Sequence, residues 1–76
     1  MAARRSNGAS IRALRESLGI PHGKFAIRCS ISPGYLTNIE KGIKQPSAEV
    51  ARRIADELGV PLDAVTYPVR DETSAA

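Results

Sequence analysis

The residues best suited to chemistry lie in one short stretch of the sequence, residues 32–42. Ser32 is a favourable N-cap, Pro33 suits the first position of a helix, and Gly42 suits the left-handed residue that ends one. The stretch therefore predicts a short helix with an inward and an outward face. The inward face holds Leu36, Ile39 and Glu40, and the outward face holds Pro33, Gly34, Thr37, Asn38 and Lys41.

The outward face of this predicted helix is small and polar, and it ends in a cation. Such a face suits a helix that lies against an anionic polymer, but an ordinary solvated face has the same composition. Both interpretations stay open on the pattern alone. The elements that position the helix are needed to distinguish between the two interpretations.

Few residues are suited to catalysis or to metal binding. The single histidine, His22, has no evident nucleophile or carboxylate partner, and no glycine-rich phosphate motif is present. His22 and Cys29 cannot complete a zinc site by themselves, since such a site needs four ligands. Cys29 is better explained as a small core residue. We expect no enzymatic activity, no metal site and no cofactor.

Charge is distributed unevenly along the 76 residues. Residues 1–47 carry eight Lys and Arg against two Glu, a net charge of +6, whereas residues 48–76 carry three Arg against six acidic residues, a net charge of −3. The basic half contains the two-faced helix. A one-sided positive field is typical of nucleic-acid binders, although proteins that bind nothing anionic also show it.

Length and composition predict one small domain with an aliphatic core, because 42% of the residues are hydrophobic and only 4% are aromatic. No apolar run approaches the length of a membrane span. Met1–Gly8 is polar and basic with no apolar segment behind it, so we expect no signal peptide. One cysteine rules out an internal disulfide framework and fits a reducing compartment.

The first helix is expected over residues 10–18, where apolar residues recur at the spacing of one buried stripe and Gly19 follows. Arg15 lies at the edge of that stripe, and a cation drawn inside needs a partner. Glu40, on the inward face of the later helix, is the candidate partner. Alternatively, both side chains extend to solvent.

A second helix is expected over residues 22–29, with a weak start because Pro21 supplies no capping side chain. Only two or three residues link it to the next helix, and so short a link makes the two helices cross steeply, as in a helix-turn-helix. Ser30 lies where such a turn favours glycine. A positive φ at Ser30 would cost about 1 to 2 kcal/mol.

Two further helical segments follow the two-faced helix. Residues 43–46 are expected to form a loop, after which Ser47 caps a regular fourth helix that Gly59 ends. Residues 60–65 are expected to form a short fifth helix or a turn. No strand signal is longer than a few residues, so the predicted fold class is all-α.

The two ends of the sequence are expected to lie outside the folded domain. Residues 1–8 are predicted to form a flexible basic arm, in which Arg4 and Arg5 can reach a DNA groove or backbone; a plain disordered terminus is the alternative. Residues 67–76 are predicted to form a C-terminal tail. The domain itself is expected to span residues 9–66.

The order and spacing of these motifs resemble the lambda-repressor/Cro-type helix-turn-helix family, also called XRE-like, over residues 11–65. The matching motifs are Ile11–Arg15, Gly19-Ile20, Phe25-Ala26, Ile31-Ser32, Tyr35–Gly42, Gln45–Ser47 and Ile54–Val60. The resemblance implies a compact five-helix domain whose second and third helices form the helix-turn-helix. It places the third helix in the DNA major groove and implies an interior ion pair between Arg15 and Glu40.

The resemblance also assigns DNA contacts to matching positions. The family usually carries long polar readers where this chain has Pro33 and Gly34, which leaves Thr37 and Asn38 as the main base contacts; the Asn38 amide can pair with adenine. Base contacts are thus expected from Pro33, Gly34, Thr37 and Asn38. Phosphate contacts are expected from His22, where the family has glutamine, and from Lys24, Tyr35, Lys41, Lys44, Gln45 and the backbone amides of residues 42–45.

We therefore expect a sequence-specific regulator of double-stranded DNA, a Cro-like repressor of a phage or mobile element, in the cytoplasm of a bacterium or a phage-infected cell. Thin base readout favours a homodimer on a two-fold symmetric site. Leu62 and Val65 are candidate dimer contacts, and core packing explains them equally well. The alternative function is a protein-interaction module, an antitoxin or adaptor on the same fold.

Overall fold

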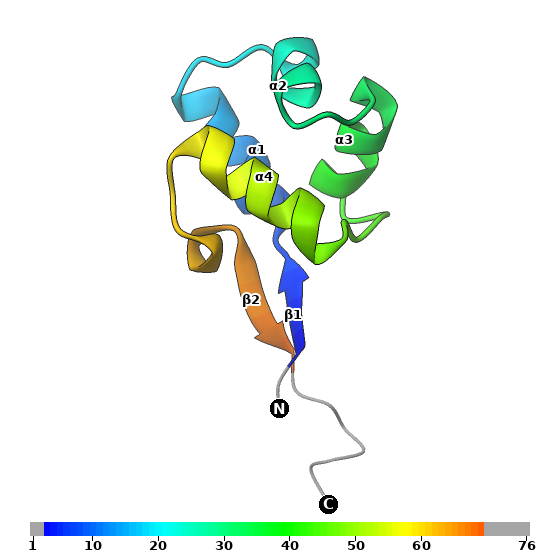
Figure 1. The fold of residues 1–76 in the computed structure, drawn as a ribbon, viewed down its shortest axis with the longest axis vertical. Helices are drawn as coiled ribbons and strands as arrows, with labels where there is room; N and C mark the ends of the chain where they lie inside the picture. Colours follow the sequence, from blue (N-terminus) through cyan, green and yellow to red (C-terminus); the bar gives the residue numbers. More distant parts are fainter. Residues whose placement is uncertain (1–2, 70–76) are drawn as a thin grey trace, which may run out of the picture.

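The computed structural model describes residues 3–69 of the chain, and four α-helices form its body (Figure 1). A short 3-10 helix and two strands complete the described part. The elements in order are β1 (Ala3–Ser6), α1 (Gly8–Ser17), α2 (His22–Arg28), α3 (Pro33–Glu40), α4 (Ala48–Leu58), the 3-10 helix η1 (Leu62–Ala64) and β2 (Thr66–Val69). In Figure 1 the two strands project from one end of the helical body, opposite α2.

Side-chain caps determine where three of the helices begin. Asn7, Ser32 and Ser47 each accept a hydrogen bond from a backbone N–H in the first turn of α1, α3 and α4 respectively, over 3.1, 3.0 and 3.2 Å. Each cap satisfies one of the N–H groups that a helix start leaves unpaired. Helix α2 begins after Pro21 without a side-chain cap, as the sequence predicts.

The turn between α2 and α3 contains the strained position that the sequence indicated. Ser30 has a φ of 60°, and it is the one non-glycine residue with positive φ within residues 3–69. Its Cβ is unfavourable there at a cost of about 1 to 2 kcal/mol. The backbone can then fold back at once, because Ile31 N donates to Ala26 O at 3.0 Å. This tight turn sets the crossing of α2 and α3.

The core is aliphatic apart from one aromatic ring and Cys29, and each of the four α-helices contributes buried residues to it. Its buried members are Ile11, Phe25, Ala26, Cys29, Leu36, Ile39, Ile54, Ala55, Leu58 and Val65. Cys29 is a core residue, as expected. Val65 is also fully buried within a single copy of the chain. The prediction of Val65 as a dimer contact is therefore wrong, and the core alternative is correct for this residue.

The prediction of an all-α, five-helix domain needs correction in two respects. The segment expected as a fifth helix forms only the three-residue η1, because Val65 turns into the core and the chain then extends. The chain ends expected to be a flexible arm and a tail instead pair as an antiparallel ribbon, with Ser6 opposite Thr66 and Ala3 opposite Val69. The other parts of the arm and tail, residues 1–2 and 70–76, lie outside the described residues.

The outer edges of this ribbon are unsuited to a third strand. Pro68, opposite Arg4, has no N–H to offer a further strand on the free edge of β2. On the free edge of β1, the N–H of Ser6 already donates to Gln45 Oε1 at 2.8 Å. Edges closed in these ways resist strand addition.

The ribbon leads into α1 through a close approach of two backbones. Asn7 N donates to Val65 O at 2.7 Å. The next residue, Gly8, is buried, and a Cβ there would overlap the carbonyl oxygen of Ile39 and lie 2.6 Å from that of Glu40. Only glycine lets α1 begin against the end of α3.

Within residues 3–69, no helix has the length and apolar character needed to cross a membrane.

Candidate nucleic-acid interface

Helix α3 presents its predicted contact face away from the core. Pro33 and Gly34 are exposed at its start, and Thr37 and Asn38 are half-buried one turn later. Leu36 and Ile39 point the other way, into the core. The two faces inferred from spacing are thus present in the structure, and the outward one is open to a ligand.

Asn38 carries the one side-chain amide of this face, and that amide has no internal partner within the described residues. Its amide makes no hydrogen bond to residues 3–69, and no buried side-chain nitrogen or oxygen in the described chain lacks a partner. The Asn38 amide is therefore accessible to solvent. It offers both a donor and an acceptor, which is the pair that the major-groove edge of adenine requires.

Thr37 differs from Asn38, because its hydroxyl is engaged within the protein. Thr37 Oγ1 donates to Pro33 O at 3.0 Å, within its own helix. It also lies 3.1 Å from Nε2 of His22, at the start of α2. A hydroxyl has one hydrogen. Thr37 therefore joins α2 to α3, and the oxygen has little left to offer a base.

A hollow of about 200 Å³ lies beside this contact, between α1, α2 and α3. Three predicted phosphate or base contacts meet there, and α1 and the ion pair complete the lining. Its lining residues are Arg12, Arg15, His22, Thr37, Glu40 and Lys41. The sequence-based assignment did not include Arg12. The sequence feature that could have pointed to Arg12 is its position one turn before Glu16. The two residues form an exposed ion pair at 3.3 Å.

The expected interior ion pair is present. Arg15 Nε donates to Glu40 Oε2 at 2.8 Å, Nη2 donates to Oε1 at 3.3 Å, and Nη1 donates to Ile20 O at 3.0 Å. The two side chains are 10% and 6% exposed. Hydrogen bonding to Glu40 raises the pKa of the Arg15 guanidinium above its ordinary value, against the opposing effect of burial. The pair ties α1 to α3 and forms a neutral floor for the hollow.

The loop after α3 uses its amides internally. The N–H of Gly42 donates to Ile39 O at 3.1 Å, and those of Ile43 and Lys44 donate to Asn38 O at 2.8 and 3.1 Å. These bonds satisfy the carbonyls at the end of α3. The expectation that the amides of residues 42–44 hold phosphates is therefore wrong. The exposed Lys44 side chain remains available for that contact.

Gln45 and Arg4 also have partners that the sequence did not reveal. The Gln45 side chain accepts a hydrogen bond from the backbone of Ser6, so its amide oxygen is not free for DNA. Arg4 donates through Nε to Thr66 Oγ1 at 2.8 Å and lies 3.3 Å from Asp63. Arg4 is therefore held against the start of β2 and η1, contrary to the flexible arm expected for residues 3–6.

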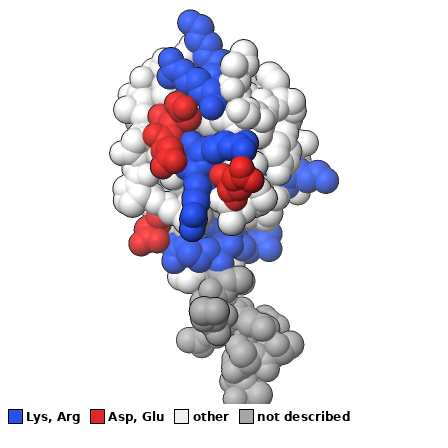
Figure 2. Space-filling view, in the orientation of Figure 1, with Lys and Arg blue, Asp and Glu red and all other residues white. Residues whose placement is uncertain are grey.

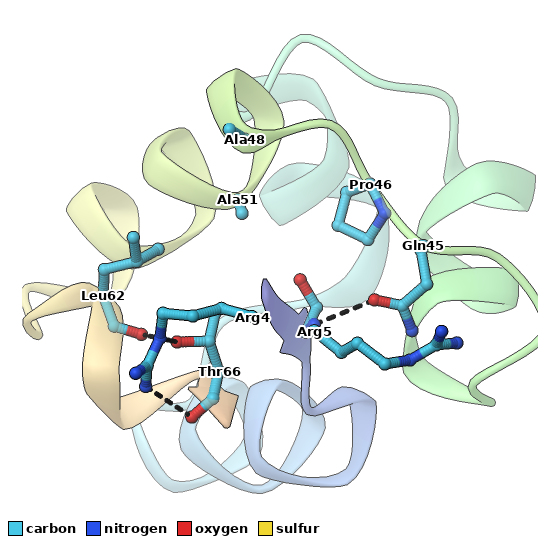
Figure 3. A pocket seen from close by; sticks show the side chains of 9 residues that line it. Arg4, Arg5, Gln45, Pro46, Ala48, Ala51, Leu62 and Thr66 are labelled. Atoms are coloured by element: carbon cyan, nitrogen blue, oxygen red, sulfur yellow. Dashed lines mark hydrogen bonds between the residues drawn. The ribbon is translucent and has the colours of Figure 1, made fainter. Parts of the chain in front are cut away.

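Figure 3 shows the second hollow that these contacts enclose, about 350 Å³ in volume. Arg4 and Arg5 enter it from β1, Gln45 and Pro46 from the loop, and Ala48 and Ala51 from α4. Leu62, the other candidate dimer contact, is half-buried on its wall. Arg5 makes no ion pair with any described residue and lies beside Gln45.

The remaining predicted phosphate contacts lie apart from the hollow of α1, α2 and α3. Lys24 is exposed on α2, and Tyr35 is half-buried and packs against the core. From α2 to the loop before α4, four Lys and Arg face one acidic residue, Glu40, which Arg15 already neutralises. On the face shown in Figure 2, which carries α4, acidic side chains lie between the basic ones. The uncompensated positive charge therefore lies on α2, on α3 and on the loop between α3 and α4.

Comparisons with known proteins agree with this geometry. The family model described as helix-turn-helix matches residues 11–65. Two Mycobacterium tuberculosis proteins, each named an uncharacterized HTH-type transcriptional regulator, are 38% identical over 53 residues, 70% of this chain. The chain spans 38% of the length of either protein.

Solved structures share the fold. The clp gene regulator ClgR from Corynebacterium glutamicum is similar with a TM-score of 0.72 and 33% identity, over 75% of this chain and 62% of that one. The restriction-modification controller protein C.AhdI from Aeromonas hydrophila has a TM-score of 0.72 at 21% identity, over 75% and 86% of the two chains. At that identity the likeness concerns the fold alone. By its motifs, its helix-turn-helix and its family match, this chain belongs to the lambda-repressor-type, XRE-like helix-turn-helix family.

Proposed function

We propose that this chain is a sequence-specific regulator of transcription that binds double-stranded DNA with α3 in the major groove. The observation that carries the proposal is the outward face of α3. It holds one side-chain amide without an internal partner in the described chain, that of Asn38, next to Thr37, which lines a hollow together with Arg12 and Lys41. The loop that follows α3 carries the exposed Lys44. Relatives named as gene or transcriptional regulators support the same function.

Base readout on this face is thin, because Pro33 and Gly34 have no side-chain donors and the Thr37 hydroxyl is engaged. Specificity then depends on Asn38, on contact between Pro33 and a thymine methyl, and on DNA shape. Two copies on half-sites about one helical turn apart would compensate for the small number of contacts. We propose such a homodimer, with Leu62 as a contact, and repression of the Cro type by occupation of an operator of a phage or mobile element.

The test is selection from random duplex DNA at moderate salt, followed by sequencing of the retained fraction. We expect an enriched two-fold symmetric site, which would support both the regulator and the dimer. An asymmetric site would support the regulator and exclude the symmetric dimer. Absence of any enriched site would contradict the proposal and favour the protein-interaction module that the fold can also provide.

Salt dependence of binding to the selected site tests the phosphate contacts separately. Lys44→Gln removes a cation from the interface and is expected to lower the salt slope by about one phosphate contact. Arg53→Gln is the matched control, because Arg53 lies on α4 in an exposed pair with Glu49. A control slope that falls as far as the Lys44→Gln slope would contradict the placement of DNA against α3 and the loop.

A further inference from the structure

The hollow of Figure 3, which we call the ribbon hollow, lies between the strand pair, the loop before α4, α4 itself and η1. Its volume of about 350 Å³ falls within the range of small-molecule pockets, about 300 to 1,000 Å³. Its described lining residues are Arg4, Arg5, Ser6, Gln45, Pro46, Ala48, Ala51, Leu62 and Thr66. None of the residues expected to contact bases is among them, so a ligand here would be separate from the outward face of α3.

Small side chains on α4 leave room for the ribbon hollow. Ala48 and Ala51 are three positions apart, so their methyl groups lie on the same face of α4. In Figure 3 these two residues and Pro46 lie across from the side chains of β1. Leu62 of η1 adds a further apolar side chain to the lining. The ribbon hollow therefore has an apolar wall against which an apolar group can pack.

A hydroxyl group without an internal partner opens into the ribbon hollow. Ser6 lines the hollow and is 8% exposed. Its backbone N–H donates to Gln45, but no hydrogen bond within residues 3–69 involves its Oγ. The hydroxyl of Thr66 differs, because it donates to Leu62 O at 2.9 Å and accepts from Arg4 Nε at 2.8 Å. The Ser6 hydroxyl is thus the polar group of the lining that has to find its partner inside the hollow.

The other available groups of the lining are hydrogen-bond donors. Gln45 Oε1 accepts from Ser6 N, so the amide nitrogen keeps two hydrogens that no described residue accepts. Arg5 lies beside Gln45 and pairs with no acidic side chain of residues 3–69. No Asp or Glu occurs among the described lining residues. The polar side of the hollow therefore suits an anion with oxygen acceptors.

The charge of the lining suits an anion with a single negative charge. Arg4 lies 3.3 Å from Asp63, whose carboxylate offsets the charge of Arg4. One positive charge, that of Arg5, then remains to be balanced. A carboxylate carries one negative charge, whereas a phosphate monoester carries about 1.5 to 2 at neutral pH. The apolar wall adds the requirement that the anion has an apolar part.

We propose that the ribbon hollow binds a small organic carboxylate, with the carboxylate group at Ser6, Gln45 and Arg5 and the apolar part against α4. The inference goes beyond the proposed function, because neither the site nor its test involves DNA.

The test is a titration of the isotope-labelled protein with hexanoate, followed by nuclear magnetic resonance. Gln45 is the sole glutamine of the sequence, so its side-chain amide is a distinct reporter. We expect the signals of this amide and of the Ser6 backbone N–H to shift, with a dissociation constant on the order of 1 mM for so small a ligand. The side-chain amide of Asn38 on α3 should not shift. Shifts at Asn38 without shifts at Gln45 would overturn the placement.

Two related probes separate the charge from the apolar part. Hexanamide keeps the chain of hexanoate and lacks its charge, whereas acetate keeps the charge and lacks most of the chain. Each is expected to bind at least about tenfold more weakly, because a charge-assisted hydrogen bond or several buried methylene groups are lost. Equal binding of hexanamide would overturn the assignment to a carboxylate. Equal binding of acetate would overturn the role of the apolar wall.

Three variants test the lining. Ala48→Leu places a larger side chain in the hollow and should abolish binding of hexanoate. Ser6→Ala and Arg5→Gln remove a hydroxyl and a charge, and each should weaken binding about three- to tenfold. Arg52→Gln, at an exposed position of α4 outside the described lining, is the control and should keep the wild-type affinity.

Thermal unfolding establishes that each variant is folded before its affinity is compared. Wild-type affinity in a folded Ala48→Leu protein would overturn the inference. Ser6→Ala removes a hydroxyl that has no partner within the described chain, so this variant should fold. Wild-type affinity in both Ser6→Ala and Arg5→Gln would overturn the inference whether or not Ala48→Leu folds.

A second copy of the chain is the competing occupant, because Leu62 in the lining is also the proposed dimer contact. Repeating the titration at tenfold higher protein concentration distinguishes the two. We expect the same dissociation constant for hexanoate at both concentrations. An affinity for hexanoate that falls as the protein concentration rises would assign the hollow to the second copy. That outcome would overturn the inference and leave the proposed regulator intact.

Discussion

Arg15 and Glu40 face each other through two parallel hydrogen bonds, of 2.8 and 3.3 Å, at a site almost closed to water. Glu40→Ala would leave the Arg15 cation with one carbonyl partner, that of Ile20. Removing one member of a buried pair is expected to lower the free energy of unfolding by about 3 to 5 kcal/mol. Urea unfolding measures the change.

Glu16→Ala is the matched control for that substitution, because Glu16 pairs with Arg12 in exposed positions. Its cost should stay below about 1 kcal/mol. Similar small losses for the two variants would show that the Arg15–Glu40 pair contributes no more than a surface pair.

Gly8→Ala should destabilise the domain, because the added methyl group would overlap the backbone of Ile39 and Glu40. Overpacking against backbone that cannot move aside costs about 1 to 3 kcal/mol or more. Gly23→Ala, at the start of α2 with open space around it, should instead be neutral or stabilise by up to about 1 kcal/mol. Thermal unfolding of both variants checks this, and a stable Gly8→Ala protein would refute the close approach of α1 and α3.

Ser30→Gly should stabilise the domain, because glycine accepts a φ of 60° without the Cβ penalty. The gain is about 1 to 2 kcal/mol in the folded state, less about 0.5 to 1 kcal/mol for the greater freedom of glycine in the unfolded chain. Ser30→Ala removes the hydroxyl and keeps the Cβ, so it should give no gain. A melting temperature that rises equally for both variants would assign the effect to the hydroxyl.

Asn38→Ala should lower the preference among DNA sequences by about 1 to 3 kcal/mol at one base pair of each half-site, as expected for a bidentate contact. Lys44→Gln should weaken binding to all sequences about equally, since a phosphate contact carries no base information. Repeating the selection with each variant distinguishes the two roles. An unchanged base profile for Asn38→Ala would remove Asn38 from the base contacts.

Burial raises the pKa of the Cys29 thiol to about 11, with a smaller contribution from Glu57. In the unfolded chain this thiol ionises at a lower pH, so between the two values the folded state holds more protons. The contribution of Cys29 to the free energy of unfolding is therefore complete below about pH 9. As the pH rises towards 11, this contribution falls by about 2 to 3 kcal/mol in all. Unfolding measured from pH 8 to 11 should show this loss in the wild type and a smaller one in Cys29→Ala. Identical alkaline profiles would contradict the buried thiol.

The sequence predicts the helical part of the fold well, because its signals are local. Ser32 and Ser47 mark the starts of α3 and α4, and Gly59 ends α4 with a φ of 70°. The strain at Ser30 also follows from the length of the turn. Each feature depends on residues within a few positions of one another, so a single sequence contains it.

The strand pair and the internal partners of Arg4 and Gln45 could not be predicted in this way. Ser6 and Thr66 lie at opposite ends of the described chain, and each strand is four residues long. Arg4 has the composition of a mobile basic arm, and only the register with β2 brings it to Thr66. The engagement of Thr37 by His22 likewise depends on how α2 crosses α3.

The ribbon of β1 and β2 also bears on the order of folding. Its two strands come from the two ends of the described chain, so pairing them directly would close a loop around the whole helical body. The contacts among helices α1 to α4 join residues that lie closer together in the sequence. Once these helices pack, the hydrogen bond from Asn7 N to Val65 O already holds the two ends close together. The ribbon is thus expected to close last and to open first, exposing β1 and β2 while α3 keeps its place.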